Sequence, residues 1–546
     1  MIELIITLYT KIIAMAKIIR PFIVVLLLLT AVSCRNKSVE LLPINGMAIG
    51  VVYNDLDKNG IYDSGKDKPV KDVMVSNGTD IVVTDKNGVY QLPLRDNAAI
   101  FVIKPSGYAF PMDKDNKPVF YRMNVPSGAS GTDFAGIAPT EPLTDPVNFA
   151  LYKNAEPDNL KILVFGDTQV RDNKEISYLQ QDIIDELIGT DAAFGITLGD
   201  VVYNDLDMFG NLTGSIAGLG IPWVYVPGNH DIDHSAVNGT DALGEWYKTF
   251  GPDYYSFNYG TAHFVVLNDI RWITDSLGSR YLTGLGEEQF EFFRRDVELI
   301  DENQLLVLLT HIPYTNSTAW ADESERERFF TVLSSHPNSL TLAAHTHVHY
   351  HEFIDSENGF YGETPHHMIS MSTTCGNWWS GAPDEFGIPH STMADGTPVS
   401  YAWLYINGSD WKLRWQGAGH DPEYQMHIDA PVSVPDSIVK KTILVTANIY
   451  NALPSAEVKI RIDNQQECIS MERTIRIDSV RLAMNIYERS LGTVPWRPLG
   501  APSPSKHLWE ATIDIGNLEP GEHLIEVEAK DIWWSYKGYR QILIGD

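Results

Sequence analysis

The first and last parts of the chain alternate apolar and polar residues, which is the pattern of half-buried strands. Before residue 150, the stretches AIGVVYND, DIVVTDKNGVYQLPL and AIFVIKP follow this pattern between Gly, Asn and Asp turns. After residue 424, KKTILVTANIY, AEVKIRID and HLWEATIDI do the same between Pro and Gly turns. We therefore predict one β-sandwich over residues 47–150 and a second over residues 425–546.

The region between the two predicted sandwiches has a different pattern of apolar and polar residues. The apolar runs KILVFGD, FGITLGD, IPWVYVPGNHD, QLLVLLTHIPY and LTLAAHTH each end in polar residues that can bind a ligand. Two helical patterns, KEISYLQQDIIDELIG and EEQFEFFRRDVELI, lie between such runs, and in the second Phe290, Phe293 and Val297 recur at helical spacing. Buried strands that alternate with helices predict an α/β fold over residues 151–424, with a site at the C-terminal ends of the strands.

The first residues are predicted to be a targeting segment. Lys17 and Arg20 precede the apolar run PFIVVLLLLTAV, which ends in small residues before Cys34. This order is typical of a secretory signal, and the run is shorter than the roughly 20 apolar residues that a spanning helix needs. The ending TAVSC resembles a bacterial lipobox, which implies a lipidated Cys34; the alternative is an ordinary signal peptide followed by a free thiol.

We therefore expect a lipoprotein signal peptide over residues 1–33 and a tether over residues 34–46. The mature chain would be a membrane-anchored lipoprotein of the cell envelope, either periplasmic or surface-exposed. The whole chain is acidic, with 41 Lys and Arg against 71 Asp and Glu and a net charge of -30 at pH 7. That charge repels a phosphate backbone and offers no basic surface, so we expect no nucleic acid as a stable partner.

Six polar residues at the ends of the apolar runs are candidate metal ligands. They are Asp167, Asp200, Asn229, His311, His345 and His347. This mixture of carboxylate, amide and imidazole groups suits Zn, Fe or Mn. One carboxylate can bridge two cations, and neutral imidazoles keep the charge of the site close to balance. The set therefore favours a dinuclear metal site over six unrelated loop residues.

The motifs FGDTQ, GDVVYND, GNHD, THIPY and AHTH resemble, in this order, those of calcineurin-like metallophosphoesterases over residues 160–350. The later GNWWSG and DGTPVSY resemble three-domain envelope members of that superfamily. The resemblance implies a four-layer αββα sandwich flanked by two all-β sandwich domains. It also implies hydrolysis of phosphate monoesters or diesters by a hydroxide that bridges two divalent or trivalent ions of Mn, Fe or Zn.

The resemblance also implies roles for individual residues. Asp167 and His347 would hold one metal, and Asn229, His311 and His345 the other, with Asp200 bridging the two. His230 would be the catalytic histidine, which donates a proton to the leaving oxygen or stabilises the charge that builds there. Asp231, the next residue, would either orient that imidazole or serve a turn or a helix cap. The adjacent Trp378 and Trp379 fit an aromatic wall beside the substrate and ordinary packing equally well.

The first motif departs from the usual Asp-x-His of the family, because Gln169 stands where the histidine would be. Gln169 can offer a metal only an amide oxygen, a weaker ligand than imidazole, so we expect the first metal to be held loosely. The substrate would be a phosphate ester of a small molecule, a lipid head group or a glycan. The alternative function is a non-catalytic or weakly catalytic surface binding lipoprotein on the same fold.

A second acidic loop lies in the predicted N-terminal sandwich. In NDLDKNGIYDSGKDKP, Asp55, Asp57, Asn59 and Asp63 follow the spacing of a calcium loop. Lys66 stands where an EF-hand has its closing Glu, which excludes a true EF-hand. The segment resembles turns of prealbumin-like β-sandwich modules, some of which hold calcium. A bound calcium and a turn that needs no ion remain the two alternatives.

Overall fold

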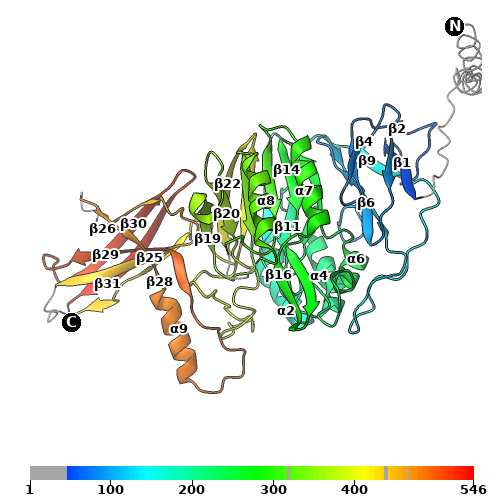
Figure 1. Ribbon diagram of the computed structural model, residues 1–546. Helices are drawn as coiled ribbons and strands as arrows, with labels where there is room; N and C mark the ends of the chain where they lie inside the picture. Colours follow the sequence, from blue (N-terminus) through cyan, green and yellow to red (C-terminus); the bar gives the residue numbers. More distant parts are fainter. Residues whose placement is uncertain (1–45, 316–319, 436–440, 464–466, 546) are drawn as a thin grey trace, which may run out of the picture.

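The computed structural model describes residues 46–315, 320–435, 441–463 and 467–545. The predicted signal peptide, Cys34 and all but the last residue of the tether lie outside the described residues. Three regions follow one another, with the predicted α/β region between the N-terminal and C-terminal ones (Figure 1). Within the described ranges, no helix has both the length and the apolar character that crossing a membrane requires.

The N-terminal region is built from two sheets of short strands. The first contains β1 (Met47–Asn54), β2 (Lys68–Pro69), β5 (Val89–Pro93), β7 (Tyr108–Ala109) and β9 (Phe149–Lys153). The second contains β3 (Met74–Ser76), β4 (Ile81–Val83), β6 (Ala98–Ile103) and β8 (Tyr121–Asn124). Strand β9 pairs in parallel with β1, so the first sheet extends to Lys153, just beyond the predicted boundary.

The central region contains two mixed sheets. One has the order β12-β11-β10-β21-β22, with β10 (Asn159–Phe165), β11 (Phe194–Leu198), β12 (Trp223–Val226), β21 (Ser400–Asn407) and β22 (Asp410–Gly417). The other has the order β13-β14-β17-β18-β20-β19, with β13 (Tyr255–Tyr259), β14 (Ala262–Val266), β17 (Leu305–Leu309), β18 (Ser339–Ala343), β19 (Tyr350–Ile354) and β20 (His366–Ser370). Strands β10, β11 and β12 run parallel, as do β14, β17, β18 and β20. A separate hairpin is formed by β15 (Ile270–Asp275) and β16 (Gly278–Thr283).

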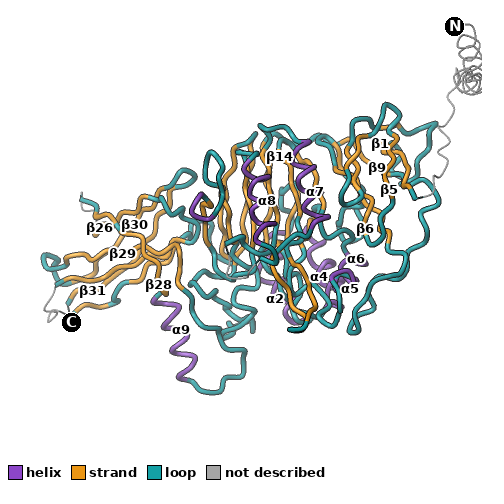
Figure 2. Tube along the Cα trace, viewed as in Figure 1, coloured by secondary structure: helices purple, strands orange, loops and turns teal. Residues whose placement is uncertain are grey.

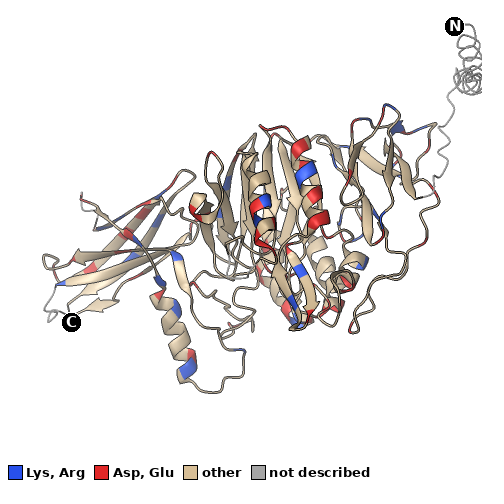
Figure 3. Ribbon diagram, viewed as in Figure 1, with Lys and Arg blue, Asp and Glu red and all other residues tan. Residues whose placement is uncertain are grey.

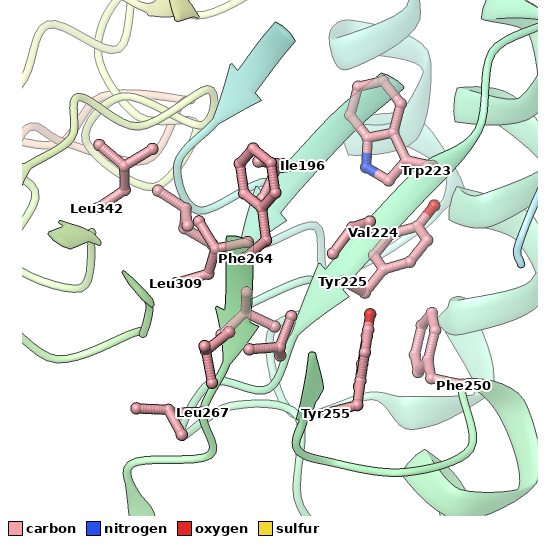
Figure 4. Packing of buried hydrophobic residues seen from close by; sticks show 14 of the residues in the cluster. Ile196, Trp223, Val224, Tyr225, Phe250, Tyr255, Phe264, Leu267, Leu309 and Leu342 are labelled. Atoms are coloured by element: carbon pink, nitrogen blue, oxygen red, sulfur yellow. The ribbon is translucent and has the colours of Figure 1, made fainter. Parts of the chain in front are cut away.

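Buried side chains of the two central sheets share one core. The rings of Phe194 on β11 and Phe264 on β14 lie 5.3 Å apart between centroids, edge to face. Figure 4 shows Ile196, Phe264, Leu309 and Leu342, from strands of both sheets, in one cluster. Burial of each such side chain contributes about 1.5–3 kcal/mol. This packing fixes the two sets of parallel strand ends relative to each other.

Helices cover the central sheets (Figure 2). They are α2 (Asn173–Leu179), the π-helix η1 (Gln180–Ile184), α3 (Asp185–Leu187), η2 (Leu206–Met208), α4 (Phe209–Ile216), η3 (Ala217–Leu219), α5 (Gly239–Ala242), α6 (Gly244–Thr249), α7 (Glu287–Leu299), α8 (Glu323–Ser334) and η4 (Ser356–Asn358). Helix α7 confirms the predicted spacing, because Phe290, Phe293 and Val297 are buried. The other predicted helix is interrupted by the π-helical turn η1. Acidic and basic residues alternate along α7 and α8 (Figure 3), so these outer helices carry mixed charge.

The C-terminal region contains two further sheets. One has β23 (Met426–Asp429), β25 (Thr442–Ile449), β29 (Pro504–Asp514) and β28 (Glu472–Ile477). The other has β24 (Ser433–Val434), β31 (Ser535–Ile544), β30 (Gly521–Lys530), β26 (Glu457–Ile462) and β27 (Ile469–Ser470). The prediction of an all-β domain is wrong in one respect, because helix α9 (Ser479–Ser490) lies between β28 and β29.

Helix α9 was not predicted from the sequence because its buried face is polar. Its buried residues are Arg481, Asn485 and Glu488, while Ile486 and Tyr487 are 60% and 65% exposed. Hydrophobic periodicity therefore points to the wrong face of this helix. The usable signal is Asp478, which caps the helix by accepting a hydrogen bond from the Arg481 backbone N–H.

A buried histidine in β20 is expected to make the central region sensitive to acid. His366 contacts the hydroxyls of Ser339 and Thr341 through its two ring nitrogens, and burial lowers its pKa to about 3. Because the unfolded pKa is about 6.5, the stability from neutral His366 is present above that pH and is lost as the pH falls toward 3. At pH 4.5 we expect a loss of about 2 kcal/mol from this residue.

The replacement His366→Gln keeps a polar side chain but removes the titration. In denaturant unfolding at pH 7 and pH 4.5, the wild type is expected to lose about 2 kcal/mol more than the variant between the two pH values. Equal losses would show that His366 does not titrate on unfolding.

Candidate metal centre

Five of the predicted ligands lie two or three residues beyond the C-terminal ends of parallel strands. Asp167, Asp200 and Asn229 come after β10, β11 and β12 of one sheet. His311 and His345 come after β17 and β18 of the other. The shared core places these strand ends next to each other, so residues far apart in the sequence meet at one place, as the apolar runs predict.

The first group of ligand atoms converges on the imidazole of His311. Its Nε2 lies 3.3 Å from Asp200 Oδ1, 3.2 Å from Asn229 Oδ1 and 3.1 Å from His345 Nδ1. A ring nitrogen carries one hydrogen at most, so it can satisfy only one of these three neighbours. A cation placed among them would be bound by all four atoms. The group therefore fits the second metal of the predicted site.

The second group joins Asp167 and His347. Asp167 Oδ2 lies 3.0 Å from His347 Nε2, but the contact lacks hydrogen-bond geometry, and within the described part of the chain this buried oxygen has no hydrogen-bond partner. Its other oxygen, Oδ1, accepts a hydrogen bond from the His345 backbone N–H. A buried carboxylate oxygen without a partner is costly, and a metal ion between Asp167 and His347 would satisfy it.

Backbone carbonyl groups orient two of the histidines. His311 Nδ1 lies 2.8 Å from the Leu198 carbonyl oxygen, and His347 Nδ1 lies 2.7 Å from that of Gly376. A carbonyl oxygen can only accept, so each Nδ1 carries the hydrogen and donates it. Once the ring is neutral, Nε2 of each histidine is the nitrogen with the lone pair, and it faces the ligand group, as metal-binding histidines require.

The charges of the site are balanced within the group. Burial opposes the charged form of His311, yet Asp200, Asp167 and Asp269 raise its pKa to about 10. Burial and the nearby His311 lower the pKa of His345 to about 4, so this ring is neutral. Metal binding would release the proton from His311, because an imidazole ligand must be deprotonated.

Several residues of the site have left-handed backbone conformations. The φ angles of Gln169, Asp200, His345 and His347 are 39°, 46°, 65° and 50°. Residues with a Cβ rarely adopt such angles, and clusters of them occur at functional sites. The loops also meet closely, because a Cβ on Gly228 would lie 2.1 Å from the Asp200 backbone nitrogen. Only glycine allows the Asn229 loop to approach the Asp200 loop in this way.

Gln169 is placed differently from the prediction. Its Nε2 donates a hydrogen bond to Asp200 Oδ2 at 2.9 Å, and its Oε1 lies 3.8 Å from the Cys375 sulfur. The amide nitrogen has no free lone pair for a metal. In this geometry Gln169 positions the carboxylate of Asp200 instead of serving as a ligand.

His230 lies beside the ligand group. Its backbone N–H donates to Asp200 Oδ1 at 2.8 Å, and its ring Nδ1 lies 2.7 Å from Asn204 Oδ1. The ring also stacks on Tyr203, with 4.6 Å between centroids. Asn204 thus holds the imidazole and leaves Nε2 available. The position of Asn204 in the GDVVYND motif, close behind Asp200, is the signal that could have identified it.

Asp231 does not orient His230, and this part of the prediction is corrected. Its carboxylate accepts hydrogen bonds from the backbone N–H groups of Val201, Val202 and Gly228. These donors surround the carboxylate and join the loop after β11 to the loop after β12. Asp231 therefore serves the second expected role, that of a turn residue.

The two adjacent tryptophans have different environments. The ring of Trp378 stacks on His347, with 4.1 Å between centroids, and is partly exposed. Trp379 is buried, and its Nε1 donates to the Thr168 carbonyl oxygen. Trp378 therefore borders the site, whereas Trp379 belongs to the packing beneath it.

The acidic loop of the N-terminal region gathers three carboxylates, from Asp55, Asp57 and Asp67. Asp67 was not among the predicted residues. The carboxylate of Asp55 accepts from the backbone N–H groups of Lys58 and Gly60, and Lys66 Nζ lies 3.5 Å from Asp57. These contacts are those of a hydrogen-bonded turn. Calcium binding at this loop stays a prediction.

The family models that match the chain cover all three regions. The N terminal of calcineurin-like phosphoesterase matches residues 57–136, calcineurin-like phosphoesterase matches residues 160–349, and the C terminal of calcineurin-like phosphoesterase matches residues 369–535. No curated protein matches the sequence.

The chain is also similar in part to two solved structures. Purple acid phosphatase PPD1 from yellow lupin (Lupinus luteus) seeds is 13% identical, with a TM-score of 0.35 over 64% of this chain and 67% of that chain. Vacuolar Protein Sorting 29 from Cryptosporidium parvum is 13% identical, with a TM-score of 0.21 over 47% of this chain and 97% of that chain. The ordered N-terminal, catalytic and C-terminal matches carry the assignment: the chain belongs to the calcineurin-like phosphoesterases.

Proposed function

We propose that this protein hydrolyses phosphate monoesters or diesters with two transition-metal ions, of Mn, Fe or Zn. The observation that carries the proposal is the convergence of Asp200, Asn229 and His345 on His311 Nε2, at 3.1–3.3 Å. The proposal takes the central region to be the four-layer αββα sandwich of the family. It places the reaction at the strand ends where these ligands meet.

The residues would divide the work as follows. Asp167 and His347 would hold one ion, and Asn229, His311 and His345 the other, with Asp200 between them. When bound, the ions supply an activated water and stabilise charge on the phosphoryl oxygens. Gln169 holds Asp200 Oδ2 in place. His230 donates its Nδ1–H to Asn204 Oδ1, so the proton for the leaving oxygen would come from Nε2 of the protonated imidazolium form.

We also propose that the protein acts at the cell envelope, anchored through lipidated Cys34. The ending TAVSC after an apolar run supports this anchor. The phosphate ester would then come from a small molecule, a lipid head group or a glycan that reaches the envelope. Mass spectrometry of the membrane-extracted protein tests the anchor, because a diacylated N-terminal cysteine adds a characteristic mass.

An assay with His230→Ala tests the catalytic proposal. Wild-type protein supplied with Mn²⁺, Zn²⁺ or Fe²⁺ is expected to hydrolyse 4-nitrophenyl phosphate or its bis ester, and to stop when a chelator removes the ions. His230→Ala is expected to lower kcat about 100-fold, because proton transfer is lost, while metal content stays the same.

His420→Ala provides the control, since His420 is exposed and stacks on Tyr424, away from the predicted ligands. This control is expected to retain wild-type kcat. A fully metallated His230→Ala protein with wild-type turnover would contradict the role given to His230.

Gln169 favours a second candidate function, a non-catalytic or weakly catalytic surface binding lipoprotein. Because Gln169 turns its amide nitrogen to Asp200, the ion at Asp167 and His347 would have one protein ligand fewer than the family pattern provides. Metal analysis separates the two functions. A folded protein that holds no metal and turns over neither ester with any of the three ions would support the binding function.

A further inference from the structure

We propose that the C-terminal region completes the substrate site by supplying Arg497, which acts with Arg171 to bind a second oxyanion on the leaving group of the substrate. The inference rests on the proposed function and adds a substrate class to it. That class is phosphate esters whose leaving group carries a further carboxylate or phosphate.

The ring of Tyr203 connects the two arginines to the site. It stacks on His230, with 4.6 Å between centroids and 20° between planes. The guanidinium carbon of Arg171 lies 4.3 Å from the centroid of this ring, and that of Arg497 lies 5.9 Å from it. Both positive groups are thus within cation–π range of one ring. Tyr203 therefore links both guanidinium groups to the ring of His230.

Arg171 is held in place but has a free donor. Its Nη1 donates to the Trp378 carbonyl oxygen at 3.1 Å and to Glu175 at 2.7 Å. Its Nη2 is buried and, among the residues that the structure describes, has no hydrogen-bond partner. A buried guanidinium N–H without an acceptor is costly. An oxyanion beside Tyr203 would provide the acceptor.

Arg497 comes from a different part of the chain. It lies in the loop between α9 and β29 and is exposed. Its backbone oxygen accepts from the Gly381 N–H at 2.8 Å, and the Gly500 N–H donates to Asn377 Oδ1 at 2.7 Å. The loop is therefore tied to the segment between β20 and β21, which carries Trp378. Figure 1 shows α9 and its loop beside that segment.

The polar buried face of α9 explains how this loop is fixed. Arg481 donates to the carbonyl oxygens of Met393 and Gly500, at 2.9 Å and 2.7 Å. Glu488 accepts from the Leu499 backbone N–H and from Trp496 Nε1, at 2.7 Å and 2.8 Å. Glu488 thus binds the segment on both sides of Arg497, and Arg481 binds it at Gly500. The helix that hydrophobic patterning overlooks is the support of the proposed contact.

Charge favours this use of the arginines. The chain has a net charge of -30, which repels an anionic substrate over most of the surface. Two guanidinium groups at the ring of Tyr203, which stacks on His230, would counter that repulsion locally. A guanidinium also suits an oxyanion geometrically, because it can donate two parallel hydrogen bonds.

The test compares substrates with and without a second oxyanion. Phenyl phosphate has none, while 4-carboxyphenyl phosphate and 1,4-phenylene bisphosphate each carry one. For at least one of the two probes that carry a second oxyanion, Arg497→Ala is expected to lower kcat/KM about tenfold, mainly by raising KM. Arg497→Ala should change kcat/KM for phenyl phosphate by less than about twofold. Arg497→Lys, which keeps the charge, should recover part of the loss.

Arg489→Ala is the matched control, because it removes the same charge from the exposed last turn of α9. It is expected to leave all three values unchanged. Equilibrium binding gives a second readout. Arg497→Ala should weaken the binding of 4-carboxybenzylphosphonate about tenfold and leave the binding of benzylphosphonate unchanged.

The outcomes separate this inference from the proposed function. If the wild type hydrolyses phenyl phosphate but Arg497→Ala affects all probes equally, or none, the inference is overturned and the proposed function stands. If the wild type hydrolyses no ester, the proposed function fails, and the binding measurements alone decide whether Arg497 recognises the second oxyanion.

Discussion

Asp200→Asn is expected to lower kcat for an aryl phosphate about 1000-fold or more and to remove most of the bound metal. Asp200 Oδ2 accepts from Gln169, and Oδ1 accepts from the His230 backbone N–H and faces His311. All three partners can donate, and an asparagine offers them only one oxygen. Its NH2 group would face a donor whichever way the amide is turned.

The lost charge adds to this effect. Burial opposes ionisation of Asp200, but His311, His230 and His345 hold its pKa below the ordinary value, so the carboxylate is negative at neutral pH. Asparagine cannot bridge two cations with a negative charge. Steady-state kinetics and atomic emission of the purified variant would measure the two losses together.

Asp205→Asn is the matched control in the same loop. Asp205 caps η2 by accepting from the Asp207 backbone N–H, a task that asparagine performs equally well. This variant is expected to keep both metal and turnover. An Asp200→Asn protein with full metal content and wild-type kcat would refute the bridging role.

The convergence of the predicted ligands could be expected from the sequence because each follows a buried apolar run. The end of a parallel strand fixes where the next residues lie, so Asp200 and His311 meet although 111 positions separate them. The direction of a side chain beyond the strand end depends on φ and ψ, which apolar patterning does not encode. Gln169 has a φ of 39°, and its amide therefore meets Asp200 in a way that no spacing rule predicts.

Sequence patterns also could not predict the contacts between polar groups. Helix α9 buries Arg481 and Glu488, so its buried face has the polar residues that are expected on an exposed face. Asp231 follows His230 directly, yet its carboxylate turns to the backbone of a loop that is 30 residues earlier in the chain. Periodicity reports on apolar burial and is silent about such polar partners.

Asp231→Ala is expected to lower the free energy of unfolding by about 4 kcal/mol. The variant leaves the N–H groups of Val201, Val202 and Gly228 without their acceptor. Each lost bond removes about 1 kcal/mol, and a buried donor that stays unpaired costs more. Urea unfolding followed by tryptophan fluorescence would measure the change. Asp207→Ala, which replaces an exposed aspartate of η2, is a control that should stay within about 0.5 kcal/mol of wild type.

Loss of stability and loss of turnover should go together in this variant. The three N–H groups belong to the loops that carry Asp200 and Asn229, so their release moves two predicted ligands of the same ion. The stability and turnover of Asp231→Asn should lie between those of Asp231→Ala and the wild type, because the amide oxygen of asparagine can still accept a hydrogen bond. If Asp231→Ala instead lowered kcat as much as His230→Ala while unfolding stayed unchanged, the carboxylate would act on the imidazole, and its assignment to the loop junction would be wrong.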